Sequence, residues 1–221
     1  MKKKILIILQ ARCTSKRFRY KSIYPINQIP LVILCAKRLS SNNKFDLIIA
    51  TSGHKRDEYI AKLANKNNIK YFCGSEKNVL SRFLKITKNL DKDYIIIRAT
   101  ADNPLPDAFF VRKCLNIYHK YKLSYFYPNN KYFKIPYGLN IEIISLNLLR
   151  KQKNTKENNE HVTYSLKKQI NLNNIKEKFV NKNYSHMNFS IDYVKEYFNT
   201  KKIMEKFDTF ETWNKILKNE K

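Results

Sequence analysis

The sequence predicts an α/β fold, a Rossmann-like, doubly wound and mostly parallel sheet with a small extended arm. Two observations carry this prediction. Short, continuous apolar runs alternate with segments of helical apolar spacing over the first 120 residues. The runs are rich in branched residues and have no regular polar face, which is typical of parallel strands covered by helices on both sides.

The expected elements follow one another in a regular order. Strands are expected at residues 4–11, 45–51, 68–74 and 93–100. Helices are expected at 30–41, 56–68, 78–90 and 108–121, because apolar residues recur there every three or four positions. Ligands bind beyond the carboxyl ends of the strands in such sheets. The loops to search are therefore 10–22, 51–57, 73–82 and 99–107.

The alternation weakens beyond residue 125. The pattern indicates a hairpin or extended arm at 124–144, helices at 145–152 and 158–170, a last strand at 187–192 and then a helical tail. The length suits a single domain, 1–221. The aromatic residues within 118–137 favour an oligomer interface, so we expect a homodimer.

The chain is strongly basic. Its formal net charge is +26, from 44 Lys and Arg against 18 Asp and Glu. This balance favours an anionic partner such as a nucleotide, an acidic metabolite or a nucleic acid. A coding bias toward Lys, Asn, Ile and Tyr would produce the same excess, so the positions of the charges decide more than their total.

Cysteine spacing and hydropathy indicate the cellular compartment in which the protein is expected. Four cysteines stand far apart with no C-x-x-C pair, which argues against a zinc site and a disulfide framework. The apolar run near the start is too short for a signal peptide, and no stretch approaches a transmembrane segment. We expect a cytoplasmic protein that does not act at a membrane.

Side chains that could bind a ligand or carry out catalysis lie just past the strands. The stretch LQARCTSKRFRYKS, residues 9–22, holds five cations directly after an apolar run. Asp102 follows one buried strand and Asp192 another short apolar one. Each acid alone could be a helix cap, but two converging carboxylates suit Mg²⁺ in phosphoryl or nucleotidyl transfer. Among the histidines, only His161, next to Glu160, is a candidate for the site.

A family resemblance rests on these residues. IILQARCTSKRFRYKS resembles the opening signature of cytidylyltransferases that activate sugars, in particular the spore-coat polysaccharide type related to acylneuraminate and 3-deoxy-manno-octulosonate cytidylyltransferases. Further matches follow in order and span residues 5–192: IPLVILCAKRL, ATS, GSEKNVLSRF, IRATADNPL, YGLNIEI, NEHVT and NFSID. Their order and spacing are more specific than any single fragment.

The resemblance implies a fold of the nucleotide-diphospho-sugar transferase type and a reaction. CMP would pass from CTP to an acidic sugar or phosphorylated small molecule, with pyrophosphate released, for surface polysaccharide or glycoconjugate synthesis. It implies CTP and an acidic acceptor as partners, Mg²⁺ or Mn²⁺ as cofactor, and an arm at about 125–165 that serves dimerisation or closes over the acceptor.

The resemblance also implies residue roles. The implied catalytic residues are Lys21, Arg12 and Asp102, and the implied metal ligands are Asp102 and Asp192. The implied nucleotide contacts are Gln10, Ala11, Arg12, Arg17, Lys21, Thr51, Ser52, Ser75, Arg82 and Thr100. The implied acceptor contacts are Asn78, Asn140, Glu142, Glu160 and His161.

The chain departs from the family pattern at three places. In the first loop, Thr14 stands where the family has glycine, and Arg19 and Tyr20 stand where it has Pro-Gly. Asn140 replaces an acid, and Glu196 takes the place of a later Asp. The residues by themselves leave two other functions possible. A nucleotide-sugar-dependent glycosyltransferase also needs a metal and a strand-end acid, although a triphosphate uses more cations. A nucleic-acid-binding protein is favoured by charge alone, without a recognisable binding signature.

Overall fold

A six-stranded sheet forms the centre of the computed structural model, which describes residues 4–41 and 45–220. The four predicted strands are confirmed as β1 (Ile5–Gln10), β4 (Asp46–Ser52), β5 (Lys70–Gly74) and β6 (Ile95–Thr100), and they run parallel. The strand order is β5-β4-β1-β6-β8-β7. The carboxyl ends of the four parallel strands therefore meet at one edge of the sheet.

Residues of the predicted arm complete the sheet. β8 (Glu142–Ser145) pairs antiparallel with β6, and β7 (Tyr125–Phe126) pairs antiparallel with β8. The expected hairpin is thus present, but its strands join the main sheet instead of projecting as an arm. A second, two-stranded sheet is formed by β2 (Pro25–Ile26) and β3 (Ile29–Pro30), just after the basic loop.

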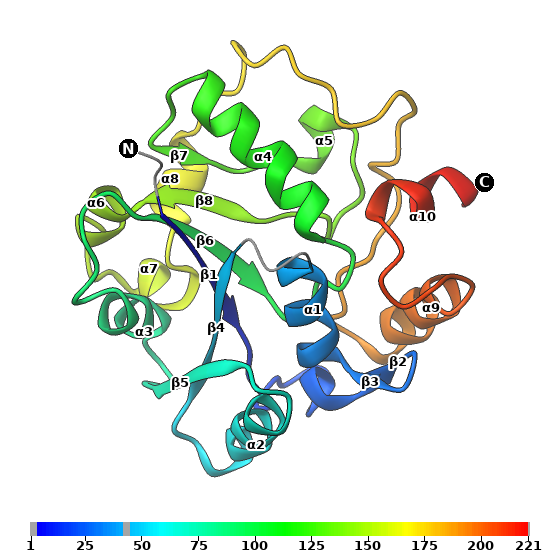
Figure 1. Ribbon diagram of the computed structural model, residues 1–221, viewed down its shortest axis with the longest axis horizontal. Coiled ribbons are helices and arrows are strands. Elements are labelled where there is room, and N and C mark those ends of the chain that lie inside the picture. Colours follow the sequence, from blue (N-terminus) through cyan, green and yellow to red (C-terminus); the bar gives the residue numbers. More distant parts are fainter. Residues whose placement is uncertain (1–3, 42–44, 221) are drawn as a thin grey trace.

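Helices cover both faces of the sheet (Figure 1). The four predicted helices are confirmed as α1 (Leu31–Ser40), α2 (Glu58–Lys66), α3 (Val79–Ile86) and α4 (Ala108–Lys120). The remaining helices are α5 (Asn130–Phe133), α6 (Leu146–Arg150), α7 (Lys156–His161), α8 (Tyr164–Gln169), α9 (Val194–Met204) and α10 (Trp213–Asn219), with 3-10 turns η1 (Lys21–Ile23) and η2 (Lys55–Asp57). No helix in the described ranges is long and apolar enough to cross a membrane.

The apolar core has two halves, one on each face of the sheet. Successive side chains of a strand point to opposite faces. On β1, Ile7 and Leu9 therefore pack with α1, α2 and α4, whereas Leu6 and Ile8 pack with α3 and α6. Figure 1 shows α3, α6 and α7 on one side of the sheet and α1 and α4 on the other.

Two expected elements differ in the structure. The helix expected at 158–170 is broken into α7 and α8 at Val162, which has a positive φ. The strand expected at 187–192 is wrong, because this segment makes only an isolated bridge between Asn188 and Tyr137. Its backbone bonds instead to two loops: Phe189 N–H donates to the Tyr137 carbonyl at 2.8 Å, and Ile191 N–H donates to the Asp102 carbonyl at 2.9 Å.

The C-terminal segment is tied to the loop that follows β6. Asp107 caps α4 by accepting from Phe110 N–H at 2.8 Å, and its second oxygen accepts from Trp213 N–H at 2.8 Å. The buried Arg38 guanidinium donates to the carbonyls of Leu105 at 2.9 Å and Glu211 at 2.8 Å. One buried cation thus joins α1, the loop after β6 and the start of α10.

Candidate active site

The loop between β1 and η1 folds back on itself. Tyr20 N–H donates to the Cys13 carbonyl at 3.0 Å, and the Ser22 hydroxyl donates to the Arg12 carbonyl at 2.9 Å. Tyr20 has a φ of +60°, in the left-handed region that glycine adopts without steric cost. The family pattern that the sequence resembles has glycine at this position. The loop thus keeps a backbone conformation suited to glycine, although the residue here is tyrosine.

Asp57 holds this loop against the end of β4. Its side chain is fully buried and accepts hydrogen bonds from Cys13 N–H at 2.6 Å and from the Ser52 hydroxyl at 2.5 Å. Burial and the Asp57 charge raise the pKa of the Cys13 thiol to about 12. Sequence reasoning marked 51–57 as a ligand loop but missed this residue. Its position as an acid shortly after the end of β4 was the sequence signal that could have identified it.

Lys21 brings the two predicted metal ligands together. Its ammonium is almost fully buried and donates to Asp102 Oδ2 at 2.9 Å, to Asp192 Oδ1 at 3.0 Å and to the Ile191 carbonyl at 2.6 Å. These three acceptors use the three N–H groups of the ammonium. The extended segment before Asp192 reaches this position because Ile191 is bonded to the Asp102 backbone.

Arg17 adds a second cation to the cluster. Its guanidinium lies 2.9 Å from the same Asp192 oxygen that Lys21 contacts, and 5.1 Å from the centre of the Tyr193 ring. The Arg17 side chain is 52% exposed, so it stands at the solvent side of the cluster while Lys21 stands inside it. The backbone of Asp192 is also fixed, since its N–H donates to Glu196 Oε2 at 2.6 Å.

The Lys21 ammonium keeps Asp102 ionised. Burial by itself raises the pKa of this carboxyl, but the Lys21 charge and hydrogen bonds from Lys21 and Thr100 outweigh it. The pKa of Asp102 therefore lies below its usual value. In this cluster the Asp102 and Asp192 carboxylates share one buried ammonium.

The two carboxylates fit the magnesium ion that the resemblance implies. Mg²⁺ takes one or two carboxylates and completes its shell with substrate phosphates and water. Asp102 and Asp192 supply such a pair, although no group of three or more His, Cys, Asp or Glu side chains that could hold a metal ion gathers here or elsewhere in residues 4–41 and 45–220. Lys21 contacts both carboxylates, so the ammonium and a metal ion would share the same ligands.

A second basic group lies at the ends of β4 and β5. Arg82 is 1% exposed, and its guanidinium donates to the Ala50 carbonyl at 3.4 Å. Burial lowers the pKa of Arg82 to about 10; the charge of Asp57 opposes this shift, and the charges of Arg12 and Arg98 add to it. Gly74 leaves room for this side chain, because a Cβ there would lie 2.8 Å from Arg82 Cγ. The structure thus buries the predicted nucleotide contact Arg82 beside the ends of β4 and β5.

The other predicted nucleotide contacts line the same edge of the sheet. Gln10 Oε1 accepts from Arg98 Nη2 at 3.1 Å, and Thr100 Oγ1 accepts from Asn103 Nδ2 at 2.9 Å. The Thr51 hydroxyl is buried and has no hydrogen-bond partner among the residues that the structure describes. Ala11 N–H is bound to the Ala50 carbonyl and Ser75 Oγ accepts from Asn78 N–H.

The predicted acceptor contacts lie farther from one another than the predicted nucleotide contacts do. Asn78 caps α3 and donates to Asn154 Oδ1 at 3.1 Å, beside α7, and Asn140 Oδ1 accepts from Asn103 at 3.2 Å. Glu160 and His161 are exposed at the end of α7, and no side-chain hydrogen bond joins them to the carboxylate cluster within the described residues.

Glu142 lies inside the protein. It is 3% exposed, and both of its oxygens are engaged by other side chains. The direct contact with an acceptor predicted for Glu142 does not suit this placement, because no carboxylate oxygen faces solvent.

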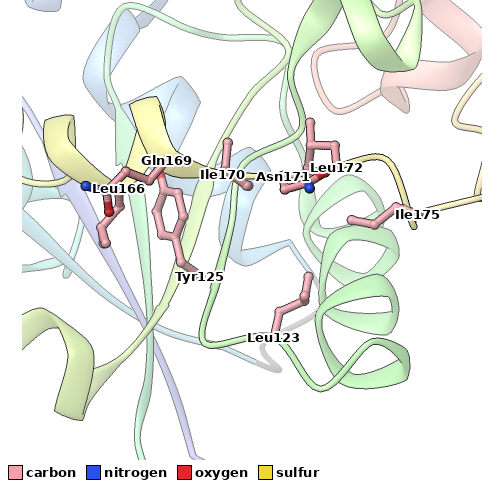
Figure 2. A pocket seen from close by; sticks show the side chains of 8 residues that line it. All are labelled: Leu123, Tyr125, Leu166, Gln169, Ile170, Asn171, Leu172 and Ile175. Atoms are coloured by element: carbon pink, nitrogen blue, oxygen red, sulfur yellow. The ribbon is translucent and has the colours of Figure 1, made fainter.

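A hollow elsewhere on the surface is separate from these residues. A pocket of about 240 Å³ lies between β7, α8 and the segment after α8 (Figure 2). Its lining is mostly apolar and consists of Leu123, Tyr125, Leu166, Gln169, Ile170, Asn171, Leu172 and Ile175. None of the predicted site residues lines it.

Comparisons with known proteins agree on one family. The sequence model of the family described as Cytidylyltransferase matches residues 6–217. An uncharacterized protein of Methanocaldococcus jannaschii is 35% identical over 173 residues, which cover 76% of this chain and 69% of the relative. The spore coat polysaccharide biosynthesis protein SpsF of Bacillus subtilis is 31% identical over 168 residues, covering 72% and 68%.

Solved structures share the fold. A cytidylyltransferase from Leptospira borgpetersenii has a TM-score of 0.84 at 22% identity, over 98% of this chain and 93% of that one. A CMP:2-keto-3-deoxy-manno-octonic acid synthetase in complex with CTP has a TM-score of 0.60 at 13% identity, over 92% and 99%. The fold is therefore that of the nucleotide-diphospho-sugar transferases.

Proposed function

The chain belongs to the cytidylyltransferase family, and we propose that it transfers CMP from CTP to an acidic sugar or a phosphorylated small molecule and releases pyrophosphate. The contact of Lys21 with both Asp102 and Asp192, at the end of the basic loop, is the observation that supports this best. By analogy with the spore coat relative, we assign the product to surface polysaccharide or glycoconjugate synthesis.

The proposed reaction is a displacement at phosphorus. An acceptor oxygen attacks the α-phosphorus of CTP, and the bond to the bridging oxygen of pyrophosphate breaks with its electron pair. Negative charge builds on the phosphate oxygens and on the leaving pyrophosphate. The protein contributes mainly by positioning the reactants and by neutralising this charge, without a covalent intermediate.

Three cations of the basic loop would bind the triphosphate. Arg12 is exposed in the loop, and Arg17 is half-exposed and contacts Asp192 and the Tyr193 ring. Both can reach a phosphate without first leaving the core. Lys21 is buried against the carboxylates and would neutralise charge next to the reacting phosphorus.

Asp102 and Asp192 would hold Mg²⁺, or Mn²⁺ in its place. When bound, the ion neutralises charge on phosphate oxygens. Two features would favour binding of the ion. The pKa of Asp102 is lowered, which keeps this carboxylate ionised, and Asp192 is held in place by Glu196 and by the backbone bond of Ile191. Phosphates of an entering nucleotide could accept the hydrogen bonds that Lys21 now donates to the carboxylates.

Nucleotide preference provides the first test. A ligand that binds only the folded state raises the melting temperature in proportion to its binding free energy. With Mg²⁺ present, CTP should raise the melting temperature more than ATP, GTP or UTP at the same concentration. Equal shifts with all four nucleotides, or a larger shift with a nucleotide-sugar than with CTP, would contradict the proposal.

Turnover provides the second test. Pyrophosphate release should depend on both CTP and one member of a panel of acidic sugars and phosphorylated small molecules. Asp102→Asn should fold and lose this release, whereas Asp93→Asn, the same change at an exposed position before β6, should retain it. Undiminished release by Asp102→Asn would remove that residue from the mechanism.

A further inference from the structure

The junction between α7 and α8 is a strained turn. Thr163 N–H donates to the His161 carbonyl at 2.6 Å, and Val162 between them has a φ of +61° and a ψ of −52°. This is the γ-turn with positive φ at its centre, which is rare. A β-branched residue seldom adopts positive φ. Val162 is nevertheless fully buried, so the surrounding structure must hold this conformation in place.

One buried side chain and one buried backbone carbonyl hold the turn. Thr163 is fully buried and its hydroxyl donates to Glu142 Oε2. On the other side of the turn, Asn158 is 2% exposed and its backbone carbonyl accepts from Val162 N–H at 2.7 Å. Glu142 is the first residue of β8, so Thr163 links the turn to the central sheet.

Glu142 is itself fixed by two cations. Its Oε1 lies 2.6 Å from Arg98 Nη1 and 2.8 Å from Lys167 Nζ, and its Oε2 accepts from the Tyr125 hydroxyl at 3.3 Å. Burial raises the pKa of Glu142, but the charges of Arg98 and Lys167 outweigh it, so the pKa lies below its usual value and the group stays ionised.

The same carboxylate is linked to the nucleotide side of the site. Arg98, which pairs with Glu142 across β6 and β8, also donates to Gln10 Oε1 at 3.1 Å. Gln10 is the last residue of β1, directly before the basic loop. A continuous path of hydrogen bonds therefore runs from the turn after His161, through Thr163, Glu142 and Arg98, to the first residue of the expected nucleotide site.

We propose that Glu142 and Thr163 are positioning residues, which hold the strained turn so that Glu160 and His161 are presented at a fixed height above the nucleotide end of the sheet. The proposal rests on the proposed function and on the acceptor contacts that the family resemblance implies for Glu160 and His161. It assigns Glu142 a role through other residues in place of direct acceptor contact. Thr163 acts on the acceptor side of the path, and Arg98 on the nucleotide side.

A matched pair of variants isolates the turn. Thr163→Val removes the hydroxyl at nearly constant size, whereas Thr163→Ser keeps it. With the panel acid that gives the fastest pyrophosphate release, Thr163→Val should raise the acceptor KM about tenfold, as expected for one lost hydrogen bond to a charged group. The Kd for CTP with Mg²⁺, measured by calorimetry, should stay within about twofold, because the Glu142–Arg98 contact is retained.

Thr163→Ser should behave like the wild type in both measurements. A general loss of stability would instead change CTP binding and acceptor KM together. Unchanged acceptor KM in Thr163→Val, or an equal loss in Thr163→Ser, would overturn the proposal. Glu142→Gln should weaken CTP binding as well as acceptor binding, since Thr163 and Arg98 both lose the charged carboxylate that they contact.

A second readout does not depend on any reaction. The chain has four histidines, so the ring resonances of His161 can be assigned in an NMR spectrum by comparison with His161→Gln. Thr163→Val should shift these resonances, and Thr163→Ser should not. Unshifted His161 resonances in Thr163→Val would overturn the positioning role even if CTP binding and turnover were established. Absence of CTP binding by the wild type would count against the proposed function alone.

Discussion

Replacing Lys21 by methionine tests how the carboxylate cluster is balanced. The ammonium contacts Asp102 and Asp192 at 2.9 and 3.0 Å and is 8% exposed. Methionine fills similar space but carries no charge. In Lys21→Met the two carboxylates would face each other without a buried cation between them, and Arg17 would remain as a half-exposed cation on one of them.

The expected cost follows from the burial of the partners. Removing one member of a buried ion pair typically costs about 3–5 kcal/mol. The carboxylate side chains are 28% and 27% exposed, so solvent screens part of the repulsion. We therefore expect a loss of about 2–3 kcal/mol in the free energy of unfolding. For a chain of this size the melting temperature should fall by about 4–12 °C.

Urea unfolding with and without Mg²⁺, in the absence of nucleotide, measures this. Mg²⁺ should stabilise Lys21→Met more than the wild type, because the ammonium no longer occupies the ligands that the ion needs. Lys218→Met, the same change at an exposed position on α10, should show neither effect. The reasoning fails if Lys21→Met is as stable as the wild type, or if Mg²⁺ stabilises both proteins equally.

Three further changes should have measurable effects. Gly138→Ala should lower the free energy of unfolding by about 2–4 kcal/mol, since the site has a φ of +89° and a Cβ would lie 2.4 Å from the Ser190 nitrogen; an unchanged melting temperature would contradict this. Asp57→Asn should cost about 1.5–3 kcal/mol in urea unfolding and weaken CTP binding, because Cys13 N–H loses a charged acceptor; unchanged CTP affinity would show that the loop needs no such anchor. The pKa of Asp102 is lowered in the folded state, so its contribution to stability is present above the unfolded pKa of about 3.9 and is lost as pH falls through the folded value; Asp102→Asn should therefore show a shallower loss of stability in acid than the wild type, and parallel curves would refute the linkage.

Local pattern was sufficient for the parallel half of the fold. The runs that became β1 and β4 are buried on both faces, so their composition alone marks them as strands. The antiparallel β8 is shorter, and nothing in four residues shows which neighbour it pairs with. The segment before Asp192 has the apolar pattern of a strand, but its hydrogen bonds go to loops, a tertiary choice that no local pattern reveals.

The site was predictable where strand-end position and family resemblance coincide. Lys21, Asp102 and Asp192 were singled out in advance, and the structure brings their side chains into contact. Their catalytic and metal-binding roles stay predictions. Asp57 was missed because its partner Cys13 is 44 residues away. The burial of Glu142 was equally hidden, since its cations come from distant elements and only folding brings them to one carboxylate.

The hydrogen bond between the start of α10 and Asp107 connects the C-terminal segment to the loop that carries Asp102. Asp107 holds Trp213 at one oxygen and the first turn of α4 at the other, five residues after Asp102. Removing the residues from Thr209 onward would take two carbonyl acceptors from Arg38 and the Trp213 N–H from Asp107. We therefore expect a protease cut or a bulky fusion near residue 210 to loosen the loop that carries Asp102, because this loop and the start of α10 meet at the N-terminal end of α4.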